Sequence, residues 1–179
     1  MIWMTRTCLS VVLYASVLGV KVIFERARVI YFNPKYVENA WGNVTRYERH
    51  GDYYVNAEFI TKCAFGNNAT LTIKFYEFRW NAYKLSLVHF HYKVCDFLER
   101  DPYIGAVVAP MFGSECPLPP GKYTLMNVTT HMDNFPNVFP FEKGRANLLF
   151  TVTSTGELLA DAELYLSFKN NIKSKTQRG

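Results

Sequence analysis

Apolar and polar residues alternate along most of this chain, with the period of two that a β-strand with one buried face requires. The alternation is clear at 158–168 and at 70–78, where Leu71, Ile73 and Phe75 share one face. Other segments rich in β-branched and aromatic residues predict further strands at 21–32, 53–63, 85–94, 122–132 and 146–153. These strands predict an all-β, immunoglobulin-like sandwich of two antiparallel sheets.

Two parts of the chain lack this alternation. Residues 35–52 are polar, which predicts a surface loop with a short strand near 44–47. Apolar residues between 96 and 110 recur at spacings nearer to helical, although Pro102 and Gly105 interrupt them. We therefore expect a short or broken helix near 96–110, lying across one opening of the sheet.

Short turn-forming segments separate the predicted strands. Gly66-Asn67-Asn68 and Asn81-Ala82 predict hairpin turns between the strands at 53–63, 70–78 and 85–94. Consecutive hairpins favour an antiparallel arrangement of these three strands.

The two ends of the chain differ from its strand-rich middle. Residues 1–19 hold an uncharged apolar core followed by small residues, which predicts a cleaved signal peptide. A membrane anchor is the alternative, but the apolar run is shorter than the roughly 20 residues needed to span a bilayer. Residues 170–179 are polar and basic, which predicts a disordered tail. We expect a secreted, extracellular protein with one domain at 20–169.

Cysteines and glycosylation signals fit that compartment. Three cysteines remain once the leader is removed, so one bridge and one thiol are expected. Cys95 and Cys116 bracket the irregular segment and are the expected pair. Cys63 is then a buried thiol or a site of pairing to a second chain. Three sequons predict glycosylation at Asn43, Asn68 and Asn127.

Charge and aromatic content limit the kinds of molecule that the protein is expected to bind. The net charge is +5 at pH 7, and the charges are spread along strands rather than gathered into a patch, which argues against nucleic acid as a partner. Aromatic residues make up 16% of the chain. Such a content of rings builds a dense core or lines an apolar cavity.

No arrangement of residues predicts an enzyme. His89 and His91 stand two apart on one predicted strand and share a face, but nothing in that strand completes a metal site. His50 lies beside Asp52 in a predicted loop, and His131 with Asp133 lies at the edge of the apolar loop of 135–141, where surface polarity explains both pairs equally well. We expect no catalytic residue, no metal and no cofactor.

The segment 135–141 is unusually apolar for a loop. Phe135, Val138, Phe139 and Phe141 lie close together and are stiffened by two prolines. They either cap the core from the side or form the rim of an apolar pocket that can dip into a lipid layer.

Several short motifs, taken in order, resemble a known family. They are Cys95-Asp96-Phe97-Leu98, Cys116-Pro117, Gly121-Lys122-Tyr123-Thr124-Leu125, Pro136, Pro140, Gly144, Ser154-Thr155-Gly156-Glu157-Leu158 and Leu166-Ser167-Phe168-Lys169. This series resembles the ML lipid-recognition superfamily, in particular the ganglioside activator and the insect secreted proteins of the chemosensory protein B group. The resemblance covers about half of the chain without its leader. It departs from the ganglioside activators at Asp161, where they carry a cysteine.

The resemblance implies a β-cup with an apolar cavity and no catalytic activity. It implies lipid presentation or a chemosensory role, with a lipid, fatty acid or cuticular hydrocarbon as ligand and a membrane surface or receptor as further partner. The residues expected to line the cavity, with the loop of 135–141 as its rim, are Leu71, Ile73, Phe75, Phe90, Tyr92, Leu148, Phe150, Leu164 and Leu166. The alternative is an extracellular protein-interaction module whose aromatic residues fill the core.

Overall fold

The computed structural model describes residues 20–113, 115–129 and 140–170 of the chain. In order along the chain, the elements are β1 (Val20–Phe32), β2 (Val37–Thr45), β3 (Tyr54–Thr61), β4 (Ala69–Arg79), β5 (Ala82–Lys93), α1 (Val94–Arg100), α2 (Gly105–Phe112), β6 (Gly121–Val128), β7 (Lys143–Val152) and β8 (Leu158–Asn170). All seven predicted strands are present. The predicted leader and nearly all of the predicted tail lie outside the described residues.

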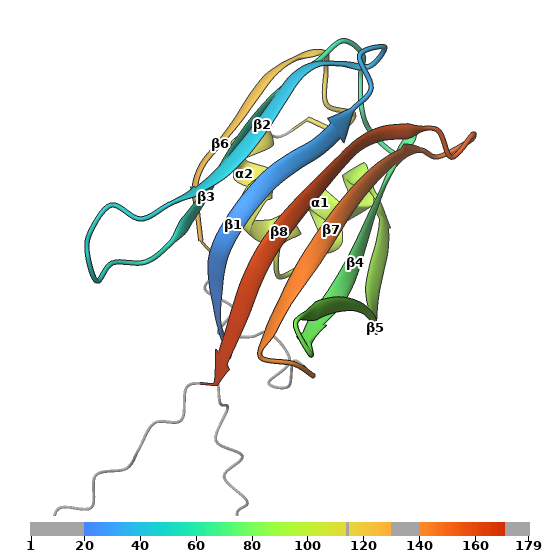
Figure 1. The fold of residues 1–179 in the computed structure, drawn as a ribbon. Helices are drawn as coiled ribbons and strands as arrows, with labels where there is room; N and C mark the ends of the chain where they lie inside the picture. Colours follow the sequence, from blue (N-terminus) through green and yellow to red (C-terminus); the bar gives the residue numbers. More distant parts are fainter. Residues whose placement is uncertain (1–19, 114, 130–139, 171–179) are drawn as a thin grey trace, which may run out of the picture.

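The strands form two antiparallel sheets that face each other (Figure 1). The large sheet has the order β1-β8-β7-β4-β5, and the small sheet has the order β2-β3-β6. The pairings among the described strands are antiparallel throughout. The predicted all-β, two-sheet sandwich is therefore confirmed.

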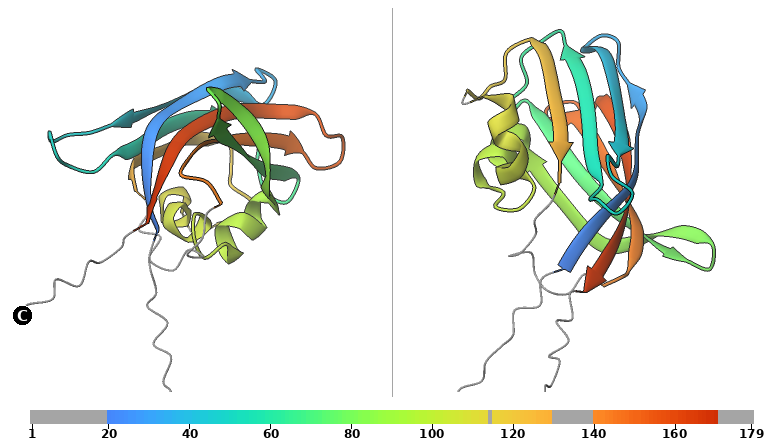
Figure 2. Two further views of the ribbon diagram at one scale, coloured as in Figure 1. Left: turned by 60° about the horizontal axis from the view of Figure 1, so that its bottom comes forward. Right: turned by 90° about the vertical axis from the view of Figure 1, so that its left-hand side faces the viewer.

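The two sheets are close along one edge and apart along the other. β1 contacts β2, and a Cβ atom added to Gly42 would lie 4.0 Å from the Cβ of Ala27. At the opposite edge the helices bridge the gap, because α1 contacts β4 and β5 whereas α2 contacts β6. Figure 2 shows both helices on this open side of the sandwich. The fold is thus a cup whose side wall is helical.

The predicted broken helix is present as α1 and α2, and Asp101 explains the break. Its Oδ1 accepts hydrogen bonds of 2.7 Å from the backbone N–H groups of Ile104 and Gly105, at the start of α2. Gly105 is needed for the close approach of the two helices, because a Cβ there would lie 2.0 Å from the carbonyl oxygen of Phe97. The break therefore fixes how the two helices pack.

A disulfide between Cys95 and Cys116 ties the helical segment to the chain just before β6. The two Cα atoms are 5.8 Å apart, and the bridge closes a separation of 21 residues. This confirms the pairing expected from the sequence. Cys63 is half-buried and unpaired, and burial raises the pKa of its thiol.

Two expectations for the first half of the chain are wrong. The segment 37–45 is a full strand of the small sheet rather than a loop, and its polar residues face outward. The turn predicted at residues 66–68 does not form a hairpin, because residues 62–68 carry the chain from β3 in the small sheet to β4 in the large sheet. Gly66 packs directly on Pro117 in this crossing, where a Cβ would lie 2.7 Å from the proline Cβ. Turn-forming residues therefore marked a change of sheet rather than a hairpin.

Candidate functional site: an apolar cavity between the sheets

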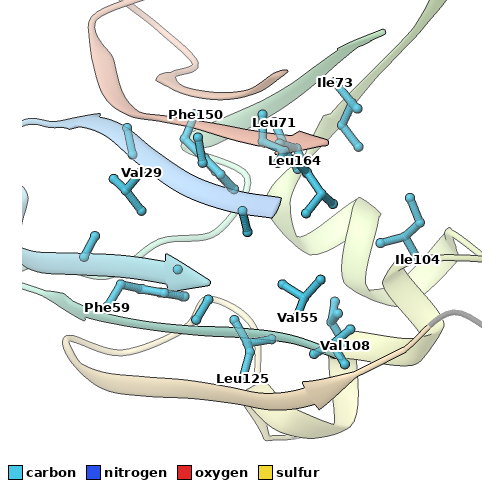
Figure 3. Close-up of a pocket in the computed structure, with 18 of the residues that line it drawn as sticks. Val29, Val55, Phe59, Leu71, Ile73, Ile104, Val108, Leu125, Phe150 and Leu164 are labelled. Carbon is cyan, nitrogen blue, oxygen red and sulfur yellow. The ribbon is translucent and has the colours of Figure 1, made fainter. Parts of the chain in front are cut away.

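A cavity of about 360 Å³ lies between the two sheets. Figure 3 shows its wall, with Leu71, Ile73, Phe150 and Leu164 pointing in from the large sheet. Val55, Phe59 and Leu125 face them from the small sheet, Val29 joins from β1, and Ile104 and Val108 close the helical side. The cavity is therefore bounded by both sheets and by the α1–α2 segment.

Eight of the residues predicted for the cavity line it. They are Leu71, Ile73, Phe75, Phe90, Leu148, Phe150, Leu164 and Leu166. All eight belong to the large sheet, where strict alternation fixed the inward face. Phe135, Val138 and Phe139 of the predicted rim lie outside the described residues.

Tyr92 and Phe141 are placed differently from the prediction, since neither is part of the cavity wall. The Tyr92 ring packs against Phe97 with centroids 5.6 Å apart, and its hydroxyl donates a 3.2 Å hydrogen bond to Asp101. Phe141 is 6% exposed and meets the ring of Phe168 edge-on at 5.6 Å. Each residue packs on a residue that lines the cavity, Tyr92 on Phe97 and Phe141 on Phe168, and does not line it itself.

The sequence-based set lacked the walls contributed by β1, the small sheet and the helices. These walls include Val22, Phe24, Ala27, Val29, Val37, Ala40, Val55, Ala57, Phe59, Phe97, Ile104, Val108, Phe112, Tyr123, Leu125 and Val128. In β1 the register shifts between Phe24 and Arg26 and again between Val29 and Tyr31, which hides the alternation. In β3 the alternation predicts that Val55, Ala57 and Phe59 share a face, but it does not predict which sheet lies opposite that face.

Small side chains at the centre of the strands keep the space open. Alanines line the cavity on β1, β2, β3, β7 and β8, at Ala27, Ala40, Ala57, Ala146, Ala160 and Ala162. Several larger lining residues, such as Val55, Phe59 and Phe150, point inward and yet are only half-buried. A packed core would cover such side chains almost completely. The inward faces therefore enclose a hollow.

The charged residues at the wall bond to protein groups on the outer faces of the sheets. Glu58 pairs with Lys122 at 2.9 Å. Glu163 accepts from Arg28 Nε at 2.8 Å and from the Tyr165 hydroxyl at 2.8 Å, and it pairs with Arg145 at 2.9 Å. Both carboxylates have protein partners, so a ligand in the cavity would meet hydrocarbon.

The ionisation of Glu163 reflects these partners. Burial opposes its negative charge, but hydrogen bonds from Arg28 and Tyr165 and the charge of Arg145 outweigh burial and lower its pKa. Asp161, two residues away, has a raised pKa because it is partly buried and lies near the Glu163 charge. These groups hold the large sheet together from outside the cavity.

His89, His91 and the sequon asparagines lie on the surface. His89 and His91 are exposed, and His91 Nδ1 lies 2.9 Å from Thr72 Oγ1. Within the described ranges, no group of three or more His, Cys, Asp or Glu side chains could hold a metal ion. Asn43, Asn68 and Asn127 are all exposed, on β2, on the loop before β4 and on β6. No helix in the described part of the chain is long and apolar enough to cross a membrane.

Comparison with known proteins finds a family model that matches one segment of the chain. Residues 68–144 match the family described as "Protein of unknown function (DUF1091)". This segment contains β4, β5, both helices, the disulfide and β6. No curated protein matches the chain.

One similar solved structure is that of chicken MD-1 complexed with lipid IVa. It is 7% identical, with a TM-score of 0.33, and the alignment covers 86% of this chain and 92% of MD-1. At this level of similarity MD-1 adds nothing to the fold, which the two sheets define by themselves.

Proposed function

We propose that this protein is a secreted, non-enzymatic carrier that holds a lipid, fatty acid or hydrocarbon between its two sheets. The observation that carries the proposal is the cavity of about 360 Å³ with its apolar wall. Small-molecule sites have volumes of roughly 300–1,000 Å³. At about 30 Å³ for each group the size of a water molecule, the cavity has room for a chain of about a dozen such groups.

Hydrocarbon burial is a sufficient source of affinity for such a ligand. Each methylene transferred from water contributes roughly 0.8 kcal/mol, so about ten methylenes can outweigh the cost of ordering the ligand. The charged residues of the wall already have protein partners, so we expect a polar head group to stay outside the cavity. Leu71, Phe150 and Leu164 of the large sheet and Val55 and Phe59 of the small sheet are proposed contacts for the chain.

Several features support the proposed extracellular location. Residues 1–19 have the composition of a signal peptide, and the Cys95–Cys116 bridge is typical of an oxidising compartment. The three sequon asparagines are exposed, as glycosylation at Asn43, Asn68 and Asn127 requires. The finer form of the proposal is presentation of the ligand to a receptor or membrane, as in the chemosensory relatives that the sequence resembles.

A substitution that fills the cavity tests the proposal. Ala57 lies on the central strand of the small sheet and lines the cavity, so Ala57→Phe places a ring where the ligand would lie. We expect displacement titrations with a fluorescent fatty acid to show that this variant binds the probe at least about tenfold more weakly than the unmodified protein.

Thr124→Phe is the matched control, because Thr124 is exposed on the outer face of the same sheet. It should bind the probe as the unmodified protein does. Equal binding by both variants would contradict a ligand site between the sheets. Absence of any uptake by the unmodified protein would instead favour the interaction module without a ligand.

A further inference from the structure

The β4–β5 hairpin carries the three most exposed large apolar side chains in the described part of the chain. Leu87 is 97% exposed, Trp80 79% and Leu85 63%. All three lie within eight residues of one another, and the hairpin projects from the edge of the large sheet (Figure 2). Trp80 lies at the turn, whereas Leu85 and Leu87 lie farther along β5. Exposed apolar side chains on a projecting hairpin mark an interaction site.

Local conformation does not account for Trp80. Trp80 and Asn81 have φ angles of 51° and 56°, so the hairpin closes with a two-residue turn of the type that favours Asn, Asp or Gly. A tryptophan at the first of these positions is unfavourable for the turn. Its side chain is also largely exposed and does not help to pack the core.

The base of the hairpin is fixed, so the tip is held in place. The Phe78 and Tyr83 rings lie 5.0 Å apart, and Tyr83 meets Tyr165 of β8 edge-on at 5.4 Å. Next to this base, residues 86–88 of β5 oppose the single residue Phe75 of β4, and Leu87 is at the centre of this bulge. The structure therefore presents Trp80, Leu85 and Leu87 from a rigid support.

Positive charges outnumber negative ones next to the turn. The Lys84 ammonium lies 4.3 Å from the centre of the Trp80 ring, and the Arg79 guanidinium lies 5.7 Å from it. Glu77 pairs with Arg79 and lies opposite Lys84 in the β4–β5 register, so it offsets one of the two positive charges, and β5 itself contains no acidic residue. Tryptophan and leucine beside lysine is the composition of segments that lie at the interface of an anionic membrane.

We propose that the β4–β5 hairpin docks the protein on an anionic lipid bilayer, with Trp80, Leu85 and Leu87 entering the interface and Lys84 contacting the head groups. Lysine is depleted in the centres of protein–protein contacts, so Lys84 beside Trp80 favours a lipid surface over a protein partner. The proposal is independent of what the cavity holds, because these side chains are not part of the cavity wall.

Vesicle sedimentation tests the proposal on the full protein. We expect binding to vesicles of phosphatidylcholine mixed with phosphatidylglycerol, weaker binding to phosphatidylcholine alone and loss of binding at high salt. Trp80→Asn and Leu87→Ser should each lower the partition coefficient about tenfold. Asparagine suits this turn better than tryptophan, so the unfolding temperature of the Trp80→Asn variant should not fall below that of the unmodified protein.

Met126→Ser is the control, because Met126 is 47% exposed on the small sheet, away from the hairpin. It should bind vesicles as the unmodified protein does. No binding to anionic vesicles, or binding that both hairpin variants retain, would overturn the proposal. Self-association that the hairpin variants abolish, without vesicle binding, would overturn it and assign the tip to a contact between two copies.

Discussion

Glu163 shows how single residues keep charge outside the cavity while the cavity wall stays apolar. It lies on β8 and its carboxylate bonds to Arg28 of β1, Arg145 of β7 and Tyr165 of its own strand. The group joins three neighbouring strands of the large sheet on their outer side. Removal of its charge should therefore weaken the sheet without any change to the cavity wall.

We predict that Glu163→Gln lowers the free energy of unfolding by roughly 1–3 kcal/mol at neutral pH, the usual cost of an incompletely bonded buried group. Because the pKa of Glu163 is lowered by folding, its charge contributes stability above the unfolded value of about 4.3. That contribution is lost as the pH falls through the folded-state pKa. Urea denaturation at a series of pH values measures both effects.

Glu99→Gln provides the comparison, since Glu99 is exposed on α1. It should leave stability nearly unchanged at neutral pH. If the difference in stability between the unmodified protein and Glu163→Gln stayed constant from neutral to acidic pH, the assigned role of Glu163 would be wrong.

Small residues decide whether the cup is hollow, and the sequence pattern did not reveal this. Alternation gave the inward face of β8 correctly, with Leu164 and Leu166 pointing in. Ala160 and Ala162 line the cavity from the same strand. Whether alanines that face each other leave a space depends on the distance between the sheets. That distance is set by the tertiary structure and cannot be predicted from the local sequence pattern.

At the scale of elements, the helical wall depends on one cross-link. The Cys95–Cys116 bridge joins the start of α1 to the chain that enters β6, and both helices lie between these two points. The helices have seven and eight residues. Isolated helices of this length are not stable, so the wall relies on packing and on the bridge.

We predict that replacement of both Cys95 and Cys116 by serine lowers the free energy of unfolding by about 3 kcal/mol, from the loop entropy regained by the unfolded chain. Peptide mapping without reduction should find these two cysteines joined in the unmodified protein. Cys63→Ser should leave that map and the stability almost unchanged. A bridge from Cys63 to either partner would contradict the assigned pairing.

The elements that could be predicted are those whose signal is local. Strict alternation located β4 and β8, and Pro102 with Gly105 marked the break between the helices. β2 was missed because its outer face carries polar residues such as Glu38 and Asn43, while its inner face includes only small residues and valine. Residues 66–68 were predicted as a hairpin turn because glycine and asparagine occur both in hairpin turns and in connections between sheets.

In the whole molecule, the large sheet provides both proposed sites, the ligand cavity on its inner face and the membrane-docking hairpin at its edge. Its inner face lines the cavity through all five strands, and its edge extends into the hairpin with Trp80 at the tip. The small sheet and the helices complete the cup (Figure 1). A carrier with this arrangement could bind an apolar molecule and a membrane at the same time.

The most direct test of the carrier function is native mass spectrometry of the protein secreted by its own expressing cells and purified without detergent or organic solvent. We expect a population heavier than the polypeptide and its glycans, which releases a hydrophobic molecule with a long hydrocarbon chain on denaturation. The Ala57→Phe variant should lack this population. If the purified protein carried no hydrophobic molecule and took up no added fatty acid or hydrocarbon, the proposed carrier function would be wrong.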